Sequence, residues 1–259
     1  MSLRIVVAGA TGWTGGAVAK AVADANDLAL VGAVARRSAG QELHGLTLVA
    51  SVKEALAVPA DVLIDYTHPT AVKDHALAAL AAGVHVVVGT SGLTAEDYRE
   101  IDVAARGAGR GVVAAGNFSL TATLLTRFAQ QAAEWIGDVE VIDYASAKKA
   151  DVPSGTAREL AEKLDAVRSH PSTTRPVAEI LGPKEARGAA IGSVQVHSVR
   201  APGFILSCEA LFSLAGERLA IRHDAGESAE PYVSGTLLAA RRVGGLIGLH
   251  RGLDAVLNG

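Results

Sequence analysis

The sequence predicts an α/β protein with a Rossmann-type, doubly wound parallel sheet and a second α+β domain with a mixed or antiparallel sheet. Apolar, strand-like runs alternate with helical segments as far as residue 115, which is the pattern of parallel βαβ units. A glycine-rich turn joins the first strand to the first helix. Later, three strand-like runs follow one another with little helix between them, as in a mixed or antiparallel sheet.

The first half of the chain consists of strands and helices in strict alternation. A short apolar run at 3–7, an Ala- and Val-rich helical segment at 15–25 and a second apolar run at 28–35 form a βαβ unit of the usual length, about 30 residues. The alternation then continues through a strand at 62–66, a helix at 70–82, a strand at 85–88, a helix at 94–107 and a strand at 111–115.

The pattern changes after residue 117. A helix at 120–136, a strand at 139–145 and a helix at 156–167 are followed by a polar segment at 169–184, which is predicted to be a long loop, and by strands at 192–199, 204–214 and 218–224. Pro231 then starts a final helix, which is expected to return to the first domain. We therefore expect a dinucleotide-binding domain at 1–116, a substrate-binding and oligomerisation domain at 117–227, and a C-terminal return at 228–259.

Composition narrows the class of protein. The chain has 259 residues, of which 49% are apolar and 20% charged, enough for two modest domains with buried cores. A net charge of -3 gives no electrostatic reason to expect nucleic acid or a membrane as partner. The single cysteine, Cys208, can form neither an internal disulfide nor a cysteine-rich metal site, and no metal is expected. No apolar run reaches the ~18 residues of a membrane span, so we expect a soluble, cytoplasmic protein.

The glycine-rich turn predicts a dinucleotide site. It reads Gly9-Ala-Thr-Gly12-Trp-Thr-Gly15. In such turns the first glycine permits a tight bend, the second lets the backbone approach a pyrophosphate, and the third allows the helix to pack closely on the strand. The free N–H groups at the start of the helix bind the anion. Gly9, Gly12, Trp13 and Thr14 are therefore expected to bind the cofactor.

The end of the second strand favours NADPH over NADH. A site that prefers NAD usually has an acidic residue there, which binds the ribose 2′-hydroxyl. Here the strand ends in Ala35, followed by Arg36 and Arg37. Arginine makes bidentate, charge-assisted hydrogen bonds to phosphate, so both side chains suit a 2′-phosphate. The alternatives are the use of both cofactors and a basic loop that only contacts solvent.

The segment 149–157 predicts a carboxylate-binding turn. It reads Lys-Ala-Asp-Val-Pro-Ser-Gly-Thr-Ala and precedes a helical run. Ser154 or Thr156 can cap the helix, and Gly155 lets the backbone turn. The exposed N–H groups of such a turn bind anions, and Lys149 adds a positive charge. Ser154, Gly155 and Thr156 are therefore expected to bind the substrate, with Lys149 as the catalytic residue. A capped helix without a ligand is the alternative.

Over nearly its whole length the chain resembles the 4-hydroxy-tetrahydrodipicolinate reductase (dihydrodipicolinate reductase) family. The motifs that carry the resemblance are Gly9 to Gly15, Asp65-Tyr-Thr-His-Pro69, Gly89-Thr-Ser-Gly92, Ala115-Gly-Asn-Phe-Ser119, Lys149 to Ala157 and His197-Ser-Val-Arg200. The resemblance implies a homotetramer that transfers a hydride from NAD(P)H to a small cyclic imine-type acid in lysine (diaminopimelate) biosynthesis. It also implies strand-end loops that contact the cofactor through Tyr66, Thr67, Gly89, Thr90, Ser91, Asn117 and Phe118. Core packing is the alternative for Tyr66 and Phe118.

The chain departs from this family pattern beside the turn. The family motif is His-His-x-x-Lys, and the two histidine positions are Ala145 and Ser146 here. Alanine has no proton to give, and serine is a poor acid at neutral pH. The proton donor is therefore Lys149, Lys148 or a bound water, and a lysine could serve if burial lowered its pKa.

Two further departures bear on the substrate. The family's Gly-x-His is Leu206-Ser207-Cys208 here, and its Ser-Arg near the return helix is Glu227-Ser228. The sequence therefore leaves three functions open: the family's own reaction at a reduced rate, reduction of a different imine acid outside lysine biosynthesis, or NADPH binding without catalysis. His197 and His223 are expected to be structural, hydrogen-bonded histidines, and Cys208 a small buried apolar residue.

Overall fold

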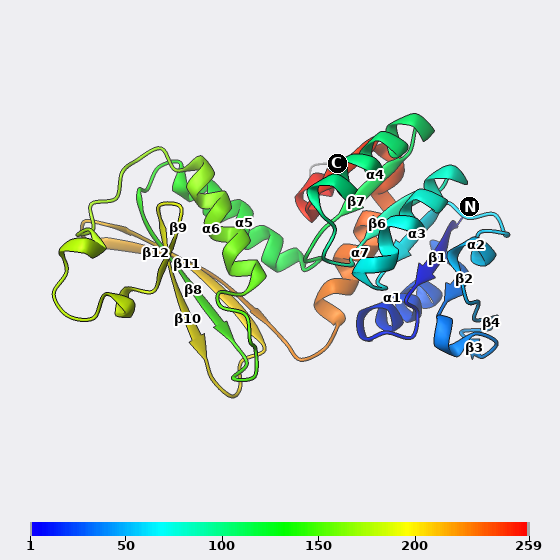
Figure 1. Ribbon diagram of the computed structural model, residues 1–259, viewed down its shortest axis with the longest axis horizontal. Helices are drawn as coiled ribbons and strands as arrows, with labels where there is room; N and C mark the ends of the chain where they lie inside the picture. The colour runs from blue at the N-terminus through cyan, green and yellow to red at the C-terminus, as the bar shows by residue number, and fades with distance from the viewer. Residues whose placement is uncertain (1, 258–259) are drawn as a thin grey trace. The chain divides into compact units, whose positions relative to one another are not determined.

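The described part of the chain, residues 2–257 of the computed structural model, forms two compact units (Figure 1). The first unit consists of the residues up to 120 and those from 229 onward, and the second consists of residues 121–228. The change of domain expected at residue 117 lies at 121 in the structure, because Phe118 is buried in the core of the first unit. The return expected at 228 lies at 229.

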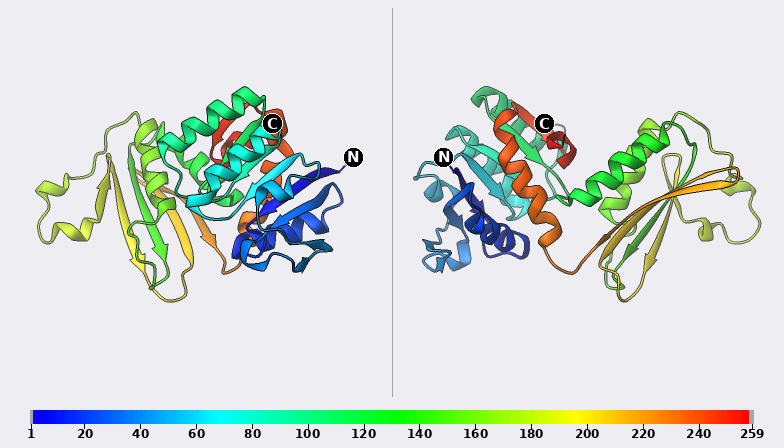
Figure 2. Two further views of the ribbon diagram at one scale, coloured as in Figure 1. Left: turned by 45° about the vertical axis from the view of Figure 1, so that its right-hand side comes forward. Right: turned by 180° about the vertical axis from the view of Figure 1, so that it is seen from behind.

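Within the described residues, the first unit contains a six-stranded parallel sheet in the order β13-β7-β6-β5-β1-β2, with helices on both faces (Figures 1 and 2). This confirms the predicted Rossmann-type sheet. Its strands are β1 Leu3–Ala8, β2 Leu28–Val34, β5 Val62–Asp65, β6 His85–Val88, β7 Gly111–Ala114 and β13 Gly248–Arg251. Its main helices are α1 Trp13–Asp24, α3 Pro69–Ala81, α4 Ala95–Ala108 and α7 Glu230–Arg242.

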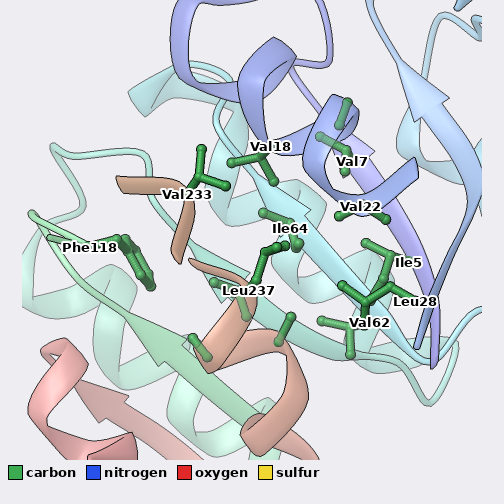
Figure 3. Close-up of a cluster of buried hydrophobic side chains, with 14 of the residues drawn as sticks. Ile5, Val7, Val18, Val22, Leu28, Val62, Ile64, Phe118, Val233 and Leu237 are labelled. Atoms are coloured by element: carbon green, nitrogen blue, oxygen red, sulfur yellow. The ribbon is translucent and has the colours of Figure 1, made fainter. Parts of the chain in front are cut away.

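Both faces of this sheet are buried because its strands are apolar at nearly every position. Successive side chains of a strand point to opposite faces. Ile5 and Val7 of β1 therefore lie in one core cluster, with Val18 of α1 and Leu237 of α7 (Figure 3). Val6 lies in the second cluster, which α3 and α4 cover. This packing fixes the carboxyl ends of the parallel strands at one edge, where loops of a Rossmann sheet bind ligands.

Three short elements of this unit are not predicted by the sequence. They are the hairpin of β3 Glu42–Leu43 and β4 Leu46–Thr47, the helix α2 Val52–Ala55 and the strand β13. Strand β13 has four residues, two of which are His250 and Arg251, so it has no apolar pattern long enough to recognise. It pairs in parallel with β7 and forms an edge of the sheet.

Within the described residues, the second unit contains a five-stranded mixed sheet in the order β12-β11-β8-β10-β9, and helices α5 and α6 lie on one face (Figure 2). Strand β8 is parallel to β10 and antiparallel to β11, which confirms the predicted mixed sheet. The elements are α5 Leu120–Ala133, β8 Asp138–Ala145, α6 Gly155–Val167, β9 Ala189–Ile191, β10 Val194–Arg200, β11 Leu206–Leu214 and β12 Glu217–Ala225. The loop between α6 and β9 contains only short 3-10 turns, at Val177–Glu179 and Lys184–Arg187.

Strand β8 carries the first polar group of the candidate site. Its residues alternate between half-buried and buried, and Val139 and Val141 belong to the core formed with α6. Asp143 is the next residue on this buried face and is fully buried. In the sheet register it lies beside Cys208 of β11 and Ser198 of β10. Asp143 therefore brings a carboxyl group onto a buried face that is otherwise apolar along β8.

Candidate active site

The glycine turn lies between β1 and α1, as the motif requires. Gly9 follows β1 with a φ of +82°, and a side chain there would come within 2.2 Å of the Tyr66 carbonyl oxygen. Gly12 is the N-cap of α1 and donates its N–H to the Gly9 carbonyl at 2.9 Å, and no side chain caps the helix. The N–H groups of the first helical turn are therefore available to an anion.

Trp13 and Thr14 begin α1. The Trp13 side chain is 62% exposed and meets the Tyr232 ring edge-on, with ring centroids 5.9 Å apart. Thr14 is half-buried. An exposed indole beside a phosphate-binding turn gives a bound nucleotide an apolar surface to pack against.

The two arginines of the candidate 2′-phosphate site directly follow β2. Ala35 is buried, whereas Arg36 and Arg37 lie in a short 3-10 turn and are exposed. Neither arginine has an ion-pair partner among residues 2–257. Both guanidinium groups are therefore free to bind an anion from solvent.

A buried carboxylate organises two of the strand-end loops. Asp65, the last residue of β5, is fully buried and accepts hydrogen bonds from the backbone N–H and hydroxyl of Thr67, at 2.9 and 2.7 Å. It also accepts one from the Thr90 hydroxyl at 2.8 Å, and His75 Nδ1 lies 2.8 Å from its other oxygen. The side chains of Thr67 and Thr90 thus hold the loops after β5 and β6 together by donating their hydroxyl protons to one carboxyl group.

Tyr66 and Phe118 pack inside the first unit. Phe118 is 1% exposed, and the two rings meet edge-on with centroids 6.2 Å apart. The Tyr66 hydroxyl lies 2.6 Å from the Thr236 hydroxyl, and burial raises the pKa of this phenol well above its usual value. The Tyr66 ring also fills the space that a side chain at Gly89 would need. Both rings therefore make packing contacts within the first unit, and their contact with a cofactor stays a prediction.

Asn117 and Ser91 occupy exposed or half-exposed loop positions. The Asn117 side-chain oxygen accepts the backbone N–H of Ser119 at 2.8 Å, which shapes the loop that leads into α5. Ser91 is exposed in the loop after β6. Both are placed where a cofactor could reach them, at the carboxyl end of the parallel sheet.

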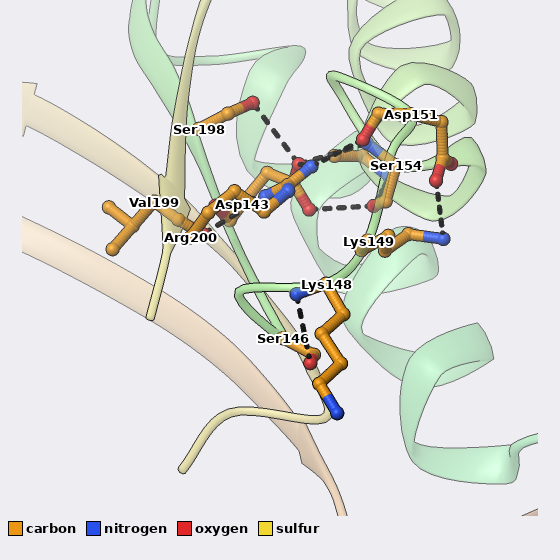
Figure 4. A network of polar contacts seen from close by, with 10 residues as sticks. Asp143, Ser146, Lys148, Lys149, Asp151, Ser154, Ser198, Val199 and Arg200 are labelled. Atoms are coloured by element: carbon orange, nitrogen blue, oxygen red, sulfur yellow. Dashed lines mark hydrogen bonds and ion pairs between the residues drawn. The ribbon is translucent and has the colours of Figure 1, made fainter. Parts of the chain in front are cut away.

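In the second unit, Ser154 is the N-cap of α6, and its side chain faces inward. It is 1% exposed, its Oγ accepts the N–H of Ala157 at 3.3 Å, and its hydroxyl donates to Asp143 Oδ1 at 2.6 Å. Its own N–H donates to Asp143 Oδ2 at 2.9 Å (Figure 4). The N–H and the hydroxyl of Ser154 are thus already bonded, and its carbonyl accepts the N–H of Arg158 at 2.9 Å. The expected contact with a substrate falls on its two neighbours.

Gly155 and Thr156 are the first two residues of α6. Gly155 is exposed and Thr156 is half-buried. Their N–H groups belong to the first helical turn, which has no intrahelical acceptors, and no hydrogen bond from either group is found among the described residues. Two adjacent N–H donors are therefore available to an anion.

Arg200 completes the support of this turn. Its Nη2 donates to Asp143 Oδ2 and to the Asp151 carbonyl, both at 2.8 Å. Ser198 adds a hydroxyl at 3.1 Å from Asp143 Oδ2. Burial alone would raise the pKa of the Asp143 carboxyl, but the hydrogen bonds from Ser154 and Arg200 outweigh it and hold the pKa below its usual value. The carboxylate is therefore ionised at neutral pH.

Lys149 lies beside the turn, and its Nζ is 2.8 Å from Asp151 Oδ1 (Figure 4). The Lys149 side chain is 33% exposed and that of Asp151 is 55% exposed, so the pair is open to solvent. Exposed ion pairs are weak, and a substrate carboxylate can compete for this ammonium group. Lys148 is exposed and points in a different direction from the same loop.

Comparison with known proteins identifies the family. The family model for the N-terminus of dihydrodipicolinate reductase matches residues 3–118, and the model for its C-terminus matches residues 121–257. The chain belongs to the dihydrodipicolinate reductase family. The 4-hydroxy-tetrahydrodipicolinate reductase of Beutenbergia cavernae is 39% identical over 260 residues, 100% of each chain, and that of Desulfitobacterium hafniense is 36% identical over 270 residues, 98% of each.

A solved structure agrees with this assignment. The dipicolinate-bound dihydrodipicolinate reductase of Paenisporosarcina sp. TG-14 superposes with a TM-score of 0.91 and 28% identity, covering 99% of this chain and 100% of that one. As a member of the family, the protein is an NAD(P)H-dependent oxidoreductase with a Rossmann-type dinucleotide-binding unit.

Two neighbouring residues occupy the positions at which the family motif implies histidines. Ala145, the last residue of β8, is fully buried, and Ser146 is half-buried in the turn that follows. In the antiparallel register Ala145 lies opposite Leu206. By the family resemblance, Leu206 stands where the family has a glycine and Ala145 where it has a histidine. The small residue and the large residue of this facing pair would then have exchanged strands.

His197, His223 and Cys208 of this unit are structural. His197 Nε2 lies 2.7 Å from Glu140 on the sheet face away from the turn, and His223 Nδ1 lies 3.0 Å from the Thr121 hydroxyl. Cys208 is fully buried, and burial raises its pKa to about 12. All three agree with the sequence-based interpretation.

The sequence-based reasoning did not assign a role to Asp65, Asp143 or Arg200. A signal for Asp143 was present in the run Asp-Val-Glu-Val-Ile-Asp-Tyr-Ala, where the alternation places this acid on the same face as Val139 and Val141. A carboxylate on a buried strand face requires hydrogen-bonding partners. Those partners, Ser154 and Arg200, come from 11 and 57 residues away, so only the fold shows them.

Proposed function

We propose that the protein reduces a small, carboxylate-bearing cyclic imine with NADPH. The observation that carries this proposal is the pair of uncommitted N–H groups of Gly155 and Thr156 beside Lys149, in a chain whose other unit has a glycine turn built for a dinucleotide. A helix start with an adjacent cation is a site for a carboxylate. The family relationship supports the redox chemistry.

The substrate carboxylate is held by the turn. The N–H groups of Gly155 and Thr156 donate to one carboxylate group, and the Lys149 ammonium moves from Asp151 to the substrate or is shared between them. Ser154 does not contact the substrate through its side chain, since that side chain is buried against Asp143. Holding the acid at one end fixes the position of the reacting C=N or conjugated C=C carbon, and such positioning is a large part of catalysis.

The residues of the first unit fit a bound dinucleotide. Gly9 and Gly12 leave the space that a pyrophosphate needs, and the start of α1 supplies N–H donors. When NADPH is bound there, its nicotinamide supplies the hydride. The exposed Arg36 and Arg37 bind the 2′-phosphate, with NADH as a weaker alternative.

The proton that the product gains comes from Lys149, from Lys148 or from a bound water. Lys149 is the first candidate because it lies beside the anion site, where it would both bind and protonate. Ala145 cannot take this part, being buried and without a labile proton.

The relatives are named for 4-hydroxy-tetrahydrodipicolinate, a lysine-pathway intermediate by family resemblance, and this is the first substrate to test. The buried Ala145 and the half-buried Leu206 favour a second candidate, a different imine acid, because by the family resemblance they replace a histidine and a glycine by an apolar surface. Such a surface suits a substrate with an apolar or absent group where the family's substrate has a polar one.

Steady-state assays separate these functions. NADPH oxidation would be measured with a panel of cyclic imine acids that includes 4-hydroxy-tetrahydrodipicolinate, and dipicolinate would be titrated as an inhibitor. Turnover of any member of the panel, with competitive inhibition by dipicolinate, supports the proposal, and the preferred member names the substrate. NADPH binding without turnover of any member would show a non-catalytic NADPH-binding protein instead.

We also propose a homotetramer, on the family resemblance and on one observation. The face of the five-stranded sheet opposite α5 and α6 is not covered by other parts of the second unit, and it carries the half-buried Ile142, Tyr144 and Leu211. Sedimentation equilibrium would measure the oligomeric state directly.

No helix within residues 2–257 is long and apolar enough to cross a membrane, and the cytoplasmic location remains a prediction from the sequence.

A further inference from the structure

One charged group of the second unit accepts four hydrogen bonds and has no contact with solvent. Asp143 is 0% exposed, yet it accepts hydrogen bonds from Ser154 N–H, Ser154 Oγ, Ser198 Oγ and Arg200 Nη2 (Figure 4). Placing an ion in the interior is costly, and many folds replace such ion pairs by apolar residues without loss of stability. Its location directly beneath the candidate carboxylate turn suggests another reason for it.

We propose that Asp143 is a positioning residue that, with Arg200, holds the Gly155–Thr156 anion site in its binding geometry. The inference rests on the proposed function, since it assumes that this site binds the substrate carboxylate. Asp143 does not touch the substrate itself. It acts through Ser154.

The geometry restrains the turn at two points. Asp143 binds both donors of Ser154, the N–H through one oxygen and the hydroxyl through the other, at 2.9 and 2.6 Å. The backbone that leads into Gly155 is thereby fixed. Arg200 binds the same carboxylate and also the carbonyl of Asp151, at 2.8 Å each, so the segment before Ser154 is fixed to the same anchor.

The same pairing also serves the electrostatics of the site. An unpaired carboxylate under the turn would repel the anion that the turn binds. Arg200 neutralises it, so the Gly155 and Thr156 N–H groups and Lys149 retain their attraction for a substrate carboxylate. The site thus uses a buried negative charge to orient donors without weakening them.

The test compares Asp143→Asn with Glu140→Gln. Glu140 lies on the same strand and is a half-buried carboxylate paired with Arg187 and His197, but it faces away from the turn. Dissociation constants for dipicolinate would be measured with NADPH bound, well below the melting temperature of each variant, together with the dissociation constant for NADPH and hydrogen exchange over residues 154–157.

Asp143→Asn is expected to weaken the binding of dipicolinate about tenfold or more and to speed hydrogen exchange of the backbone amides over residues 154–157. The affinity for NADPH should change less than about twofold. Glu140→Gln should leave dipicolinate affinity and this exchange unchanged, whatever it does to stability. If Asp143→Asn does not fold, Ser198→Ala, which removes one contact at 3.1 Å, should weaken dipicolinate about two- to fivefold.

The outcomes are distinct. Dipicolinate affinity in Asp143→Asn, or in the fallback variant, that matches the wild-type protein overturns the positioning role and leaves the proposed function standing. An equal loss in Asp143→Asn and Glu140→Gln also overturns it, because the effect would then be general loss of structure. A wild-type protein that binds no dipicolinate overturns the proposed carboxylate site and this inference together.

Discussion

Restoring a histidine at position 145 should require the removal of Leu206. Ala145 is fully buried and lies directly opposite Leu206 in the antiparallel β8–β11 pair. Facing residues of such a pair have Cβ atoms about 4.5–5.5 Å apart, so an imidazole at 145 would meet the leucine side chain. The double variant Ala145→His with Ser146→His should therefore be overpacked, at a cost of about 1–3 kcal/mol.

The size exchange predicts that the two changes compensate. Leu206→Gly alone should cost about 2–5 kcal/mol, because it removes a partly buried side chain and adds a flexible glycine to a strand. When Leu206→Gly is combined with the histidine pair, the overpacking at 145 and the space left at 206 should partly cancel. The double-mutant cycle should then show a coupling free energy of about 1–3 kcal/mol. Leu211→Gly is the matched control, because Leu211 lies on the same strand but on the other face, opposite Glu140. It should combine with the histidine pair additively.

Urea unfolding gives the stabilities, and NADPH oxidation with 4-hydroxy-tetrahydrodipicolinate gives the activity. A general acid typically contributes ~10²–10⁴-fold, so the unmodified protein should be slow on this substrate and the triple variant faster. An additive cycle would refute the steric reasoning. A wild-type turnover of ~10 s⁻¹ or more would refute the reasoning about the missing acid, and another group would then have to supply the proton.

Three further predictions concern the lysine beside the turn, the arginine pair after β2 and a buried histidine. Lys149→Ala should fold and bind NADPH normally, but its turnover should fall by at least ~100-fold. Lys163→Ala, farther along α6, is the control and should keep the wild-type turnover. Unchanged kinetics in Lys149→Ala would remove the residue from the mechanism. Replacing Arg36 and Arg37 by Ala should weaken the binding of NADPH about ten- to a hundredfold and leave the affinity for NADH unchanged. Both affinities would be measured by Trp13 fluorescence in a Trp135→Phe background. Equal effects on the two cofactors would contradict a 2′-phosphate site. Burial lowers the pKa of His223, so the unfolded chain binds its proton more readily, and stability should fall as the pH drops below about 6.5. His85 acts in the same direction, so the measurement is the flatter urea-stability profile of His223→Gln relative to wild type.

Periodicity and turn chemistry predicted most of the fold. Strand β6 has the predicted bounds, and the other long elements differ from them by at most a few residues, because long apolar runs and periodic helices are decided locally. Strand β13 and the β3–β4 hairpin could not be predicted in this way. Each has at most four residues, and each owes its existence to a neighbour distant in sequence or to a tight turn.

The sequence predicted which residues lie at the candidate site, but not which of their atoms face outward. The turn at 154–156 and Lys149 do lie together, but Ser154 faces inward and the donors are its neighbours. Tyr66 and Phe118 follow strand ends, as cofactor residues would; Phe118 is buried in the core, and the half-buried Tyr66 packs against it. Sequence identifies which residues are near a strand end. Whether a side chain points out or in depends on partners such as Thr236, which lies 170 residues away from Tyr66.

The two units share one structural solution at their candidate sites. In each, a fully buried aspartate at or near the carboxyl end of a parallel-paired strand binds both the backbone N–H and the hydroxyl of a residue in the loop that follows: Asp65, the last residue of β5, binds Thr67, and Asp143, two residues before the end of β8, binds Ser154. A loop at a ligand site cannot be fixed by apolar packing on its outer side, because that side must stay open. A carboxyl group beneath it offers several acceptors at one point and orients the loop from below. Asp65 thus has the same relation to the strand-end loops of the first unit as Asp143 has to the turn of the second, and the cost of burying each carboxyl group is offset where a site needs rigid donors.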